Sequence, residues 1–192
     1  RKLRIRHTLG NGFYAEYDDQ KSLPVEEVAM LRLRMEDIVA RNIPITREKR
    51  LAEEVAKEYE AYDFDDRLEL INTRPRLYRT VNFLDNMPGY FYGELAPSTG
   101  YVPHFDIAPY YNGLYVALPA RTNPRQVTTT IQHDKMFDIF HEYQEWIDIM
   151  GVPTVGDLNR RVMQGDSSEL IQIAEAFHEN KIAAIARSIA EA

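Results

Sequence analysis

The sequence predicts an α+β fold followed by an all-helical extension. In the first part, alternating segments typical of strands, such as "RKLRIRHTL" and "RLYRTVNFL", are separated by segments with helical periodicity. From Gln132 onward, apolar residues recur only at helical spacing. The polar, proline-containing segment "ARTNPRQVTTT" lies between the two parts. We therefore expect an α+β domain over residues 1–120 and a helical part over residues 121–192.

Local patterns predict the elements of the first part. A "GNG" turn joins the first strand to a second, "FYAEY". Ser22 and Pro24 indicate the start of a helix that Pro44 closes off. The next segment, "ITREKRL", fits either a strand or the first turn of a helix that runs to Tyr62. Further on, "HFDIAPYYNGLYVALP" predicts a β-hairpin that turns at Asn112–Gly113.

Three helices are expected in the second part. The first carries an apolar stripe and ends at Gly151, a residue that favours helix termination. A short helix is expected over Val155–Met163, and a long one begins near Asp166 and Ser167 and runs to the C-terminus.

Composition excludes several classes of function. With 44% hydrophobic and 28% charged residues, the 192-residue chain has ordinary globular composition. A formal net charge of −7 argues against tight, non-specific nucleic-acid binding. No apolar run approaches the roughly 20 residues that span a bilayer, and the N-terminus lacks the pattern of a signal peptide. We therefore expect a cytoplasmic protein without a membrane or nucleic-acid partner.

Cysteine is absent, which removes disulfides, thiolate nucleophiles and thiolate metal ligands. The chain also opens directly on a strand-like segment without an initiator Met, which predicts a fragment of a longer protein.

No complete catalytic constellation is found in the sequence. There is no G-x-x-x-x-G-K-[ST] loop, no G-x-S-x-G and no H-E-x-x-H. One helical face carries four ionisable residues, which fit a solvated face better than a metal site: Asp134, Asp138, His141 and Glu145. Glu175 and His178 have the Glu-x-x-His spacing of di-metal bundles, but the second pair that such sites need is missing. We therefore expect no metal site.

Two segments resemble a known family. "GNGFYAEYDD" and "LRLRMEDIVARNIPITREKRLAEEVAKEY" resemble the second additional, editing-type domain of threonyl-tRNA synthetase, over roughly the first 120 residues. The resemblance implies the same sheet-and-helix fold. It also implies that a strand begins at Ile45 and that a helix follows it.

Three other segments are similar to the N-terminal region of bacterial uridine kinase and phosphoribulokinase-like nucleoside kinases: "YFYGELAPSTGYVPHF", "DLNRRV" and "AEAFHENKIAAIARSIAEA". This resemblance implies a parent nucleoside kinase whose catalytic domain follows in the same chain and uses ATP and Mg²⁺. We expect the present chain to be a non-catalytic module of it, inactive by itself and without a cofactor of its own. Association with further copies of the chain is left open.

The synthetase resemblance also implies a degenerate site. In the editing domain, the stretch matching "YFYGEL" carries a Cys, a His and a nearby acid, completed by an upstream histidine pair. Here the Cys position is Phe91, the His position is Leu95 and the acid position is Gly89. Phenylalanine and leucine neither ligate a metal nor exchange protons. We expect both side chains to lie on a strand, buried against the sheet and the helix over residues 28–38.

Two alternatives to the kinase module remain open. An aminoacyl-tRNA deacylase is disfavoured by the lost Cys and His positions. A small-molecule sensor would use a groove lined by Tyr92, Ser98, Thr99, Tyr101 and His104. The plainer interpretation of these residues is that "PSTG" forms a turn and that the tyrosines pack the sheet. Exposed side chains at the former Cys and His positions would favour the sensor.

Overall fold

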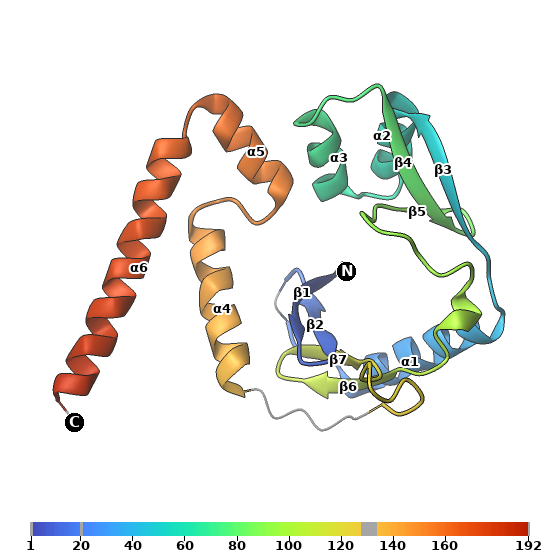
Figure 1. Ribbon diagram of the computed structural model, residues 1–192, viewed down its shortest axis with the longest axis horizontal. Coiled ribbons are helices and arrows are strands. Elements are labelled where there is room, and N and C mark those ends of the chain that lie inside the picture. Colours follow the sequence, from blue (N-terminus) through green and yellow to red (C-terminus); the bar gives the residue numbers. More distant parts are fainter. Residues whose placement is uncertain (1, 20, 128–133, 192) are drawn as a thin grey trace. The chain divides into compact units, whose positions relative to one another are not determined.

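A computed structural model describes residues 2–19, 21–127 and 134–191. Within these residues the fold is α+β, with two antiparallel sheets and six α-helices, the last three forming a C-terminal helical stretch (Figure 1). Two compact units are present, one made of Arg1–Glu48 with Asn82–Phe140 and the other of Lys49–Val81 with His141–Ala192. The expected boundary after residue 120 falls inside the first of these units.

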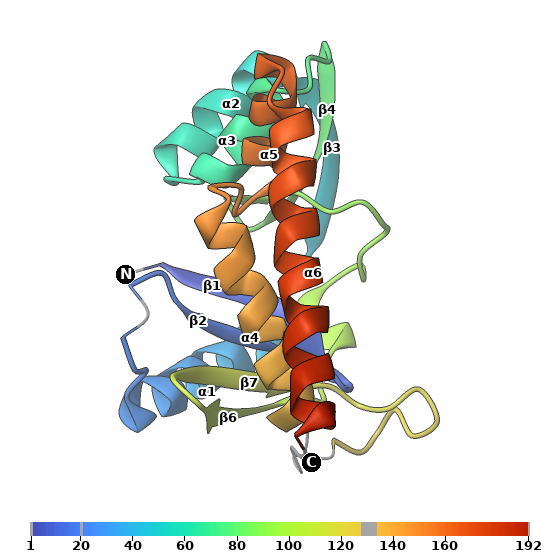
Figure 2. The ribbon, with the colours of Figure 1, turned by 90° about the vertical axis from the view of Figure 1, so that its left-hand side faces the viewer.

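The first unit is built on a four-stranded sheet with the order β1-β2-β7-β6 (Figure 2). β1 (Leu3–Leu9) and β2 (Gly12–Tyr17) form the expected N-terminal hairpin. β6 (Asp106–Tyr110) and β7 (Gly113–Ala117) form the second hairpin, and β7 pairs with β2.

One face of this sheet is covered by α1 (Val25–Ala40). Alternating side chains on the strands meet this helix, because successive residues of a strand point to opposite faces. The apolar cluster between them consists of Ala15, Leu23, Val28, Ile107, Leu114 and Val116. The helix is also tied to the sheet by Arg32, which donates to the carbonyl oxygen of Ile107 and pairs with Asp106.

An aromatic cluster covers the opposite face of the sheet. Phe137, in the first turns of α4 (Asp134–Ile149), stacks on Tyr111 with ring centroids 3.9 Å apart and meets the edge of Tyr14 at 5.0 Å. His7 stacks between Tyr14 and Phe140, with centroid distances of 5.5 and 4.6 Å. Phe137 is only 6% exposed, so this residue anchors the start of α4 on the sheet.

The second sheet has the strand order β3-β4-β5. Its strands are β3 (Ile45–Leu51), β4 (Tyr78–Leu84) and β5 (Met87–Gly89). Only three residues of β5 pair with β4, ending at Asn82 opposite Gly89. Pro88, in the middle of β5, has no N–H to donate to a ladder, which is typical of a short edge strand.

Helices dominate the second unit. α2 (Ala52–Ala61) buries Val55 and Tyr59, and it is followed by α3 (Asp65–Asn72). α5 (Val155–Gln164) packs closely on α3, since a Cβ added to Gly156 would lie 2.9 Å from Cγ of Glu69. The ends of α5 follow standard capping chemistry: Thr154 accepts a hydrogen bond from the backbone N–H of Asp157 at 3.2 Å, and Gly165 takes a left-handed conformation at the C-cap.

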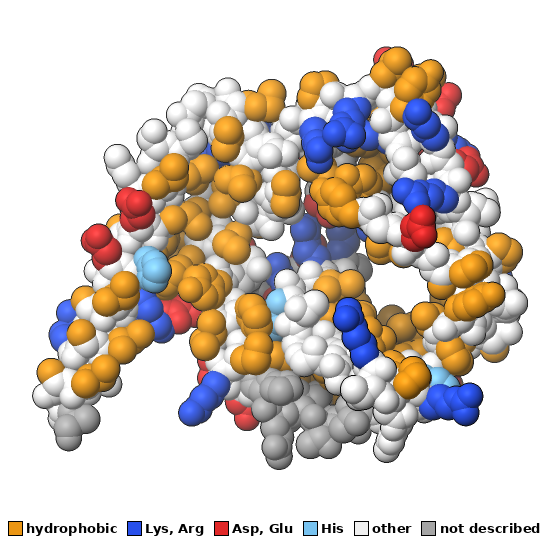
Figure 3. Space-filling view, in the orientation of Figure 1, with side chains coloured by type: hydrophobic (Ala, Val, Ile, Leu, Met, Phe, Trp, Pro, Cys, Tyr) orange, Lys and Arg blue, Asp and Glu red, His pale blue; other side chains and the backbone are white. Residues whose placement is uncertain are grey.

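The last helix, α6 (Ser167–Ala190), pairs with the second part of α4. Trp146 of α4 stacks on Phe177 of α6 with ring centroids 5.5 Å apart, and Lys181 donates to Glu142. Several isoleucines of α6 stay exposed, and hydrophobic side chains are visible along this helix in Figure 3. No helix among the described residues has the length and apolar character needed to cross a membrane.

Most of the expected elements are present, with three differences. The β6–β7 turn is formed by residues 111–112, one position earlier than expected, and Tyr111 takes a left-handed conformation there. α3 was not expected from the sequence. The expected strand over "YFYGEL" is wrong, because this segment has no regular structure after β5 ends at Gly89. The expected start of the helical part at Gln132 lies outside the described residues.

Candidate ligand pocket

The segment that resembles the editing site is irregular and exposed. Phe91 is 50% exposed and Leu95 is 37% exposed, so the expected burial of both side chains is wrong. The physical reason is the early end of β5: ladder pairing with β4 stops at Gly89, and the residues that follow are not in a strand. Neither residue lines a buried former site.

Gly89 and Phe91, which the sequence resemblance aligns with the acid and the Cys of the editing domain, lie next to each other in space. A Cβ added to Gly89 would lie 2.9 Å from Cε2 of Phe91, so the phenyl ring occupies the space that a side chain at position 89 would need. An acidic residue at position 89 would therefore require the ring of Phe91 to move from its present position.

Regular contacts resume at Pro97, where the chain is fixed to the end of α1. The carbonyl oxygen of Pro97 accepts from the N–H of Ile45 at 2.9 Å, and Ser98 forms a β-bridge with Pro44. A short 3₁₀ helix, η1 (Thr99–Tyr101), follows. The "PSTG" segment is thus an anchored bridge and the first turn of a helix.

The hydroxyl of Thr99 links two backbone groups. Thr99 is 6% exposed, and its Oγ1 accepts from the N–H of Ile43 at 2.9 Å and donates to the carbonyl oxygen of Ile38 at 2.7 Å. The Ile38 carbonyl lies in the last turn of α1, where carbonyl groups lack helical partners. Thr99 therefore satisfies a helix end, and its hydroxyl is already occupied on both sides.

Gly100 is required by a close approach to Asn42. The Asn42 backbone is left-handed, with φ of 49°. Its side-chain oxygen accepts from the N–H of Gly100 at 3.2 Å and from the hydroxyl of Ser98. A Cβ at Gly100 would lie 2.4 Å from that oxygen, so only glycine fits without a shift.

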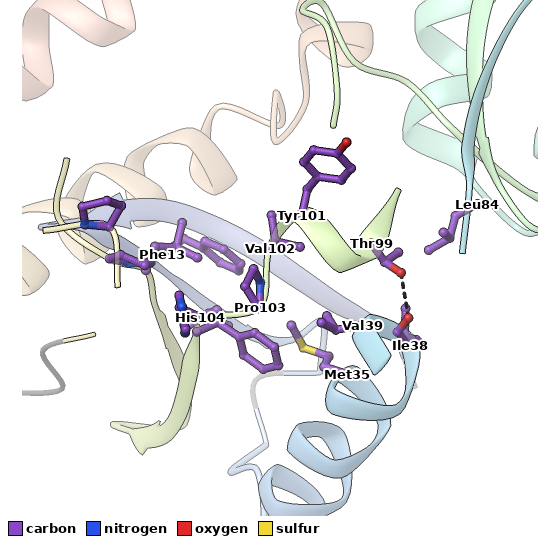
Figure 4. A pocket seen from close by; sticks show the side chains of 15 residues that line it. Phe13, Met35, Ile38, Val39, Leu84, Thr99, Tyr101, Val102, Pro103 and His104 are labelled. Carbon is purple, nitrogen blue, oxygen red and sulfur yellow. Dashed lines mark hydrogen bonds between the residues drawn. The ribbon is translucent and has the colours of Figure 1, made fainter. Parts of the chain in front are cut away.

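An apolar pocket of about 560 Å³ lies beside this anchored segment (Figure 4). All of its lining residues belong to the first unit. They come from β2, the last two turns of α1, β4, the segment after Ser98, β7 and the loop after β7: Phe13, Met35, Ile38, Val39, Leu84, Thr99, Tyr101, Val102, Pro103, His104, Phe105, Val116, Leu118, Pro119 and Pro124.

Three of the five residues expected in a ligand groove line this pocket, namely Thr99, Tyr101 and His104. Tyr92 does not, and it is 78% exposed; Ser98 is buried and bonded to Asn42. Exposures of 78% for Tyr92 and 68% for Tyr101 show that the interpretation of these tyrosines as sheet packing is wrong. Ligand binding by the pocket stays a prediction.

Sequence reasoning missed most of the apolar lining. Phe13 and Val116 lie on the helix-facing side of β2 and β7, and Met35 and Ile38 belong to the apolar stripe of α1. Periodicity predicts that such side chains face the core, but it does not show where the core is left open.

Among the described residues, no three His, Asp or Glu side chains are grouped to hold a metal ion. Asp134 instead accepts from the hydroxyls of Tyr110 and Tyr111, at 3.3 and 3.4 Å. His141 lies 3.8 Å from Glu145 on the same helix. The expected absence of a metal site stays a prediction.

The tyrosine cluster under α4 has perturbed acidity. Burial, with the nearby Tyr111 and Asp134, raises the pKa of Tyr110 to about 12. Burial and the hydrogen bond to Glu16 likewise raise the pKa of Tyr14. These hydroxyls are neutral donors at physiological pH and are not poised for proton transfer.

Part of the chain is similar to threonine–tRNA ligases. No protein-family model matches the chain. It is 32% identical over 111 residues to the threonine–tRNA ligase of Rickettsia akari (strain Hartford), a match that covers 55% of this chain and 17% of the ligase. The threonine–tRNA ligases of Geobacillus sp. (strain WCH70) and Carboxydothermus hydrogenoformans are 32% and 30% identical over the same length and shares.

The chain is similar to the N-terminal region of threonyl-tRNA synthetases. It spans about 17% of the length of these relatives. The α+β fold agrees with this similarity. None of the three relatives is a nucleoside kinase, so the expected kinase parent stays a proposal.

Proposed function

We propose that this chain is a non-catalytic module that binds a small molecule in a synthetase-type editing fold. The observation that carries the proposal is the apolar pocket of about 560 Å³ beside the anchored segment that begins at Ser98. Its volume lies in the range of small-molecule sites, and mostly apolar lining with few polar groups is their usual character.

A deacylase is the weaker candidate because the required chemistry is missing. Phe91 and Leu95 stand at the positions of the editing Cys and His, and Gly89 stands at the acid position. The side chains at positions 91 and 95 are exposed and offer neither a metal ligand nor a general base.

Two measurements test the proposal. In ¹H–¹⁵N spectra of the 192-residue chain, a fragment library should yield ligands whose shift changes cluster at residues 99–105 and at Val116. The chain should not release serine from seryl-tRNA(Thr) faster than buffer does. Serine release at enzymatic rates, lost in a variant of residues 89–95, would establish a deacylase instead. Shift changes scattered over the surface would contradict the pocket.

A kinase parent is the second candidate, and it rests on sequence resemblance. The segment "AEAFHENKIAAIARSIAEA", which resembles the helix ahead of the kinase domain in nucleoside kinases, lies within α6 (Ser167–Ala190). In this proposal the chain regulates or presents substrate to a catalytic domain that uses ATP and Mg²⁺. The full gene product should phosphorylate uridine, whereas residues 1–192 alone should not. Lack of any nucleoside phosphorylation by the full product would reject this parent.

A further inference from the structure

We propose that the pocket takes a small amphiphile with an apolar body and a carboxylate head, and that the head lies beside the loop that carries Arg121 and Arg125. This inference rests on the proposed ligand-binding function and adds the chemical class of the ligand. Two features carry it: the lining of the pocket and the charge on one of the loops that line it.

The lining offers almost no hydrogen-bonding groups. Of the fifteen lining side chains, only Thr99, Tyr101 and His104 carry polar atoms that could bond to a ligand. The hydroxyl of Thr99 is occupied by Ile38 and Ile43. In Figure 4 the hydroxyl of Tyr101 points away from the other labelled side chains. A nucleoside or a polar amino acid would leave several of its own polar groups unsatisfied here, which is costly.

The apolar lining side chains come from several segments of the first unit. In Figure 4, Leu84 lies on one side and Phe13 and His104 on the other, with Met35, Val39 and Val102 between them in this view. A ligand made of methylene groups or a ring system can contact these side chains, and its affinity should rise with each apolar group buried.

Two positively charged residues lie on the loop after β7, which contributes to the lining of the pocket. Leu118, Pro119 and Pro124 line the pocket, and Arg121 and Arg125 lie in the same two-turn loop. Both arginines are exposed, and neither forms an ion pair with a carboxylate of the described residues.

Five of the six other described arginines of the first unit pair with a carboxylate, and Arg47 is the exception. Arg6 pairs with Glu16 at 2.9 Å, and Arg41 pairs with Asp85 at 3.6 Å. In a chain of net charge −7, two guanidinium groups without a carboxylate beside an apolar pocket are complementary to an anionic head.

A polypeptide segment is a poorer occupant. An extended peptide brings an N–H and a carbonyl with every residue, and these groups need partners when they are buried. Because the lining supplies mainly hydrocarbon, a small amphiphile with one polar end satisfies the pocket better.

The apolar body is tested by calorimetric titration of the 192-residue chain with octanoate, decanoate and dodecanoate below their micellar concentrations. We expect one site per chain and roughly fourfold tighter binding per added methylene until the pocket is filled. Val102→Trp, at a lining residue that is 54% exposed, should fill the pocket and weaken decanoate at least about tenfold without loss of fold by circular dichroism.

The head group is tested by charge reversal. The double variant Arg121→Glu/Arg125→Glu should weaken decanoate by at least about tenfold and leave decanol unchanged. Arg76→Glu, a charge reversal at an exposed arginine of the second unit, is the matched control. It should change neither the affinity for decanoate nor the affinity for decanol. The salt dependence of decanoate binding should also disappear in the double variant.

Each other outcome is decisive. Equal binding of decanoate and decanol, insensitive to the double variant, overturns the carboxylate head. Uridine or threonine bound at one site and blocked by Val102→Trp keeps the proposed function and overturns the ligand class. Binding of a peptide in the pocket, without binding of the fatty acids, also overturns the ligand class. If no compound of any class is blocked by Val102→Trp, the proposed function itself fails.

Discussion

The ring of Phe91 occupies the space beside Gly89, so that a Cβ at position 89 would lie 2.9 Å from Cε2 of the ring. The acid and Cys positions of the editing-like segment are therefore linked by contact. Phe91 is half exposed, which leaves its ring free to rotate away from a new side chain.

This contact predicts coupling between the two positions. Gly89→Ala should be destabilising by about 1 kcal/mol when Phe91 is present, because the ring must leave its position, and by less when Phe91 is alanine. Urea unfolding of the two single variants and the double variant measures the coupling. Additive effects within error would show that the ring moves freely and that the positions are independent.

The exposure of Phe91 and Leu95 predicts tolerance to substitution. Leu95→Ala should lower the free energy of unfolding by less than about 1 kcal/mol, well below the roughly 2–5 kcal/mol of a buried leucine. Phe91→Cys with Leu95→His should also unfold close to the original midpoint. Val55→Ala, at a fully buried position of α2, is the control and should cost more. A large loss at Leu95 would indicate that its surface is covered in solution.

The hydroxyl of Thr99 forms two hydrogen bonds, and removing it should lower the free energy of unfolding. Thr99→Val keeps the volume but leaves the N–H of Ile43 and the carbonyl of Ile38 without this partner, so we expect a loss of about 1–3 kcal/mol. Thr99→Ser keeps the oxygen and should lose much less. A loss in Thr99→Val that is no larger than the loss in Thr99→Ser, measured by chemical unfolding, would show that the two hydrogen bonds of the hydroxyl contribute no more than its methyl group.

The central place of Phe137 predicts that it holds the start of α4 on the sheet. Phe137→Ala should cost roughly 3–5 kcal/mol, because it removes a buried ring that contacts Tyr14, Tyr110 and Tyr111. Ile139→Ala, on the same helix but 51% exposed, is the matched control and should be nearly neutral. Similar losses in the two variants would contradict the anchoring role.

Alkaline pH should weaken the same region. The pKa of Tyr110 is raised from 10.0 to about 12, so the folded state keeps this proton more tightly than the unfolded state. The resulting stability is fully present below pH 10 and is lost as the pH rises toward 12. Tyr110→Phe should flatten part of that decline in urea midpoints between pH 9 and about 12. Part remains, because burial also raises the pKa of Tyr14. An unchanged pH profile would contradict the shift.

Periodicity and turn chemistry were sufficient to predict most of the fold. Strand alternation and turn signals predicted β1, β2, β4, β6 and β7, and residues that favour helix starts predicted α1 and α6. Helix α3 was not predicted, because its eight residues are rich in acids and none of them is fully buried.

The site was less predictable because it depends on contacts between distant segments. The resemblance to an editing domain led to the expectation that Phe91 would be buried, but ladder pairing stops at Gly89 and the side chain is exposed. The pocket arises where α1 ends and the segment from Ser98 is fixed to Pro44. No local pattern indicates that bridge.

The chain has a single tryptophan, and the stacking of Trp146 on Phe177 gives it a diagnostic use. Its fluorescence reports on the helical unit alone, whereas the tyrosines under α4 report on the sheet unit. Tryptophan emission therefore follows the second unit, whereas tyrosine absorbance is weighted toward the first unit, which contains eight of the twelve tyrosines. Melting curves recorded at the two wavelengths would reveal whether the units unfold together or one after the other, without any added label.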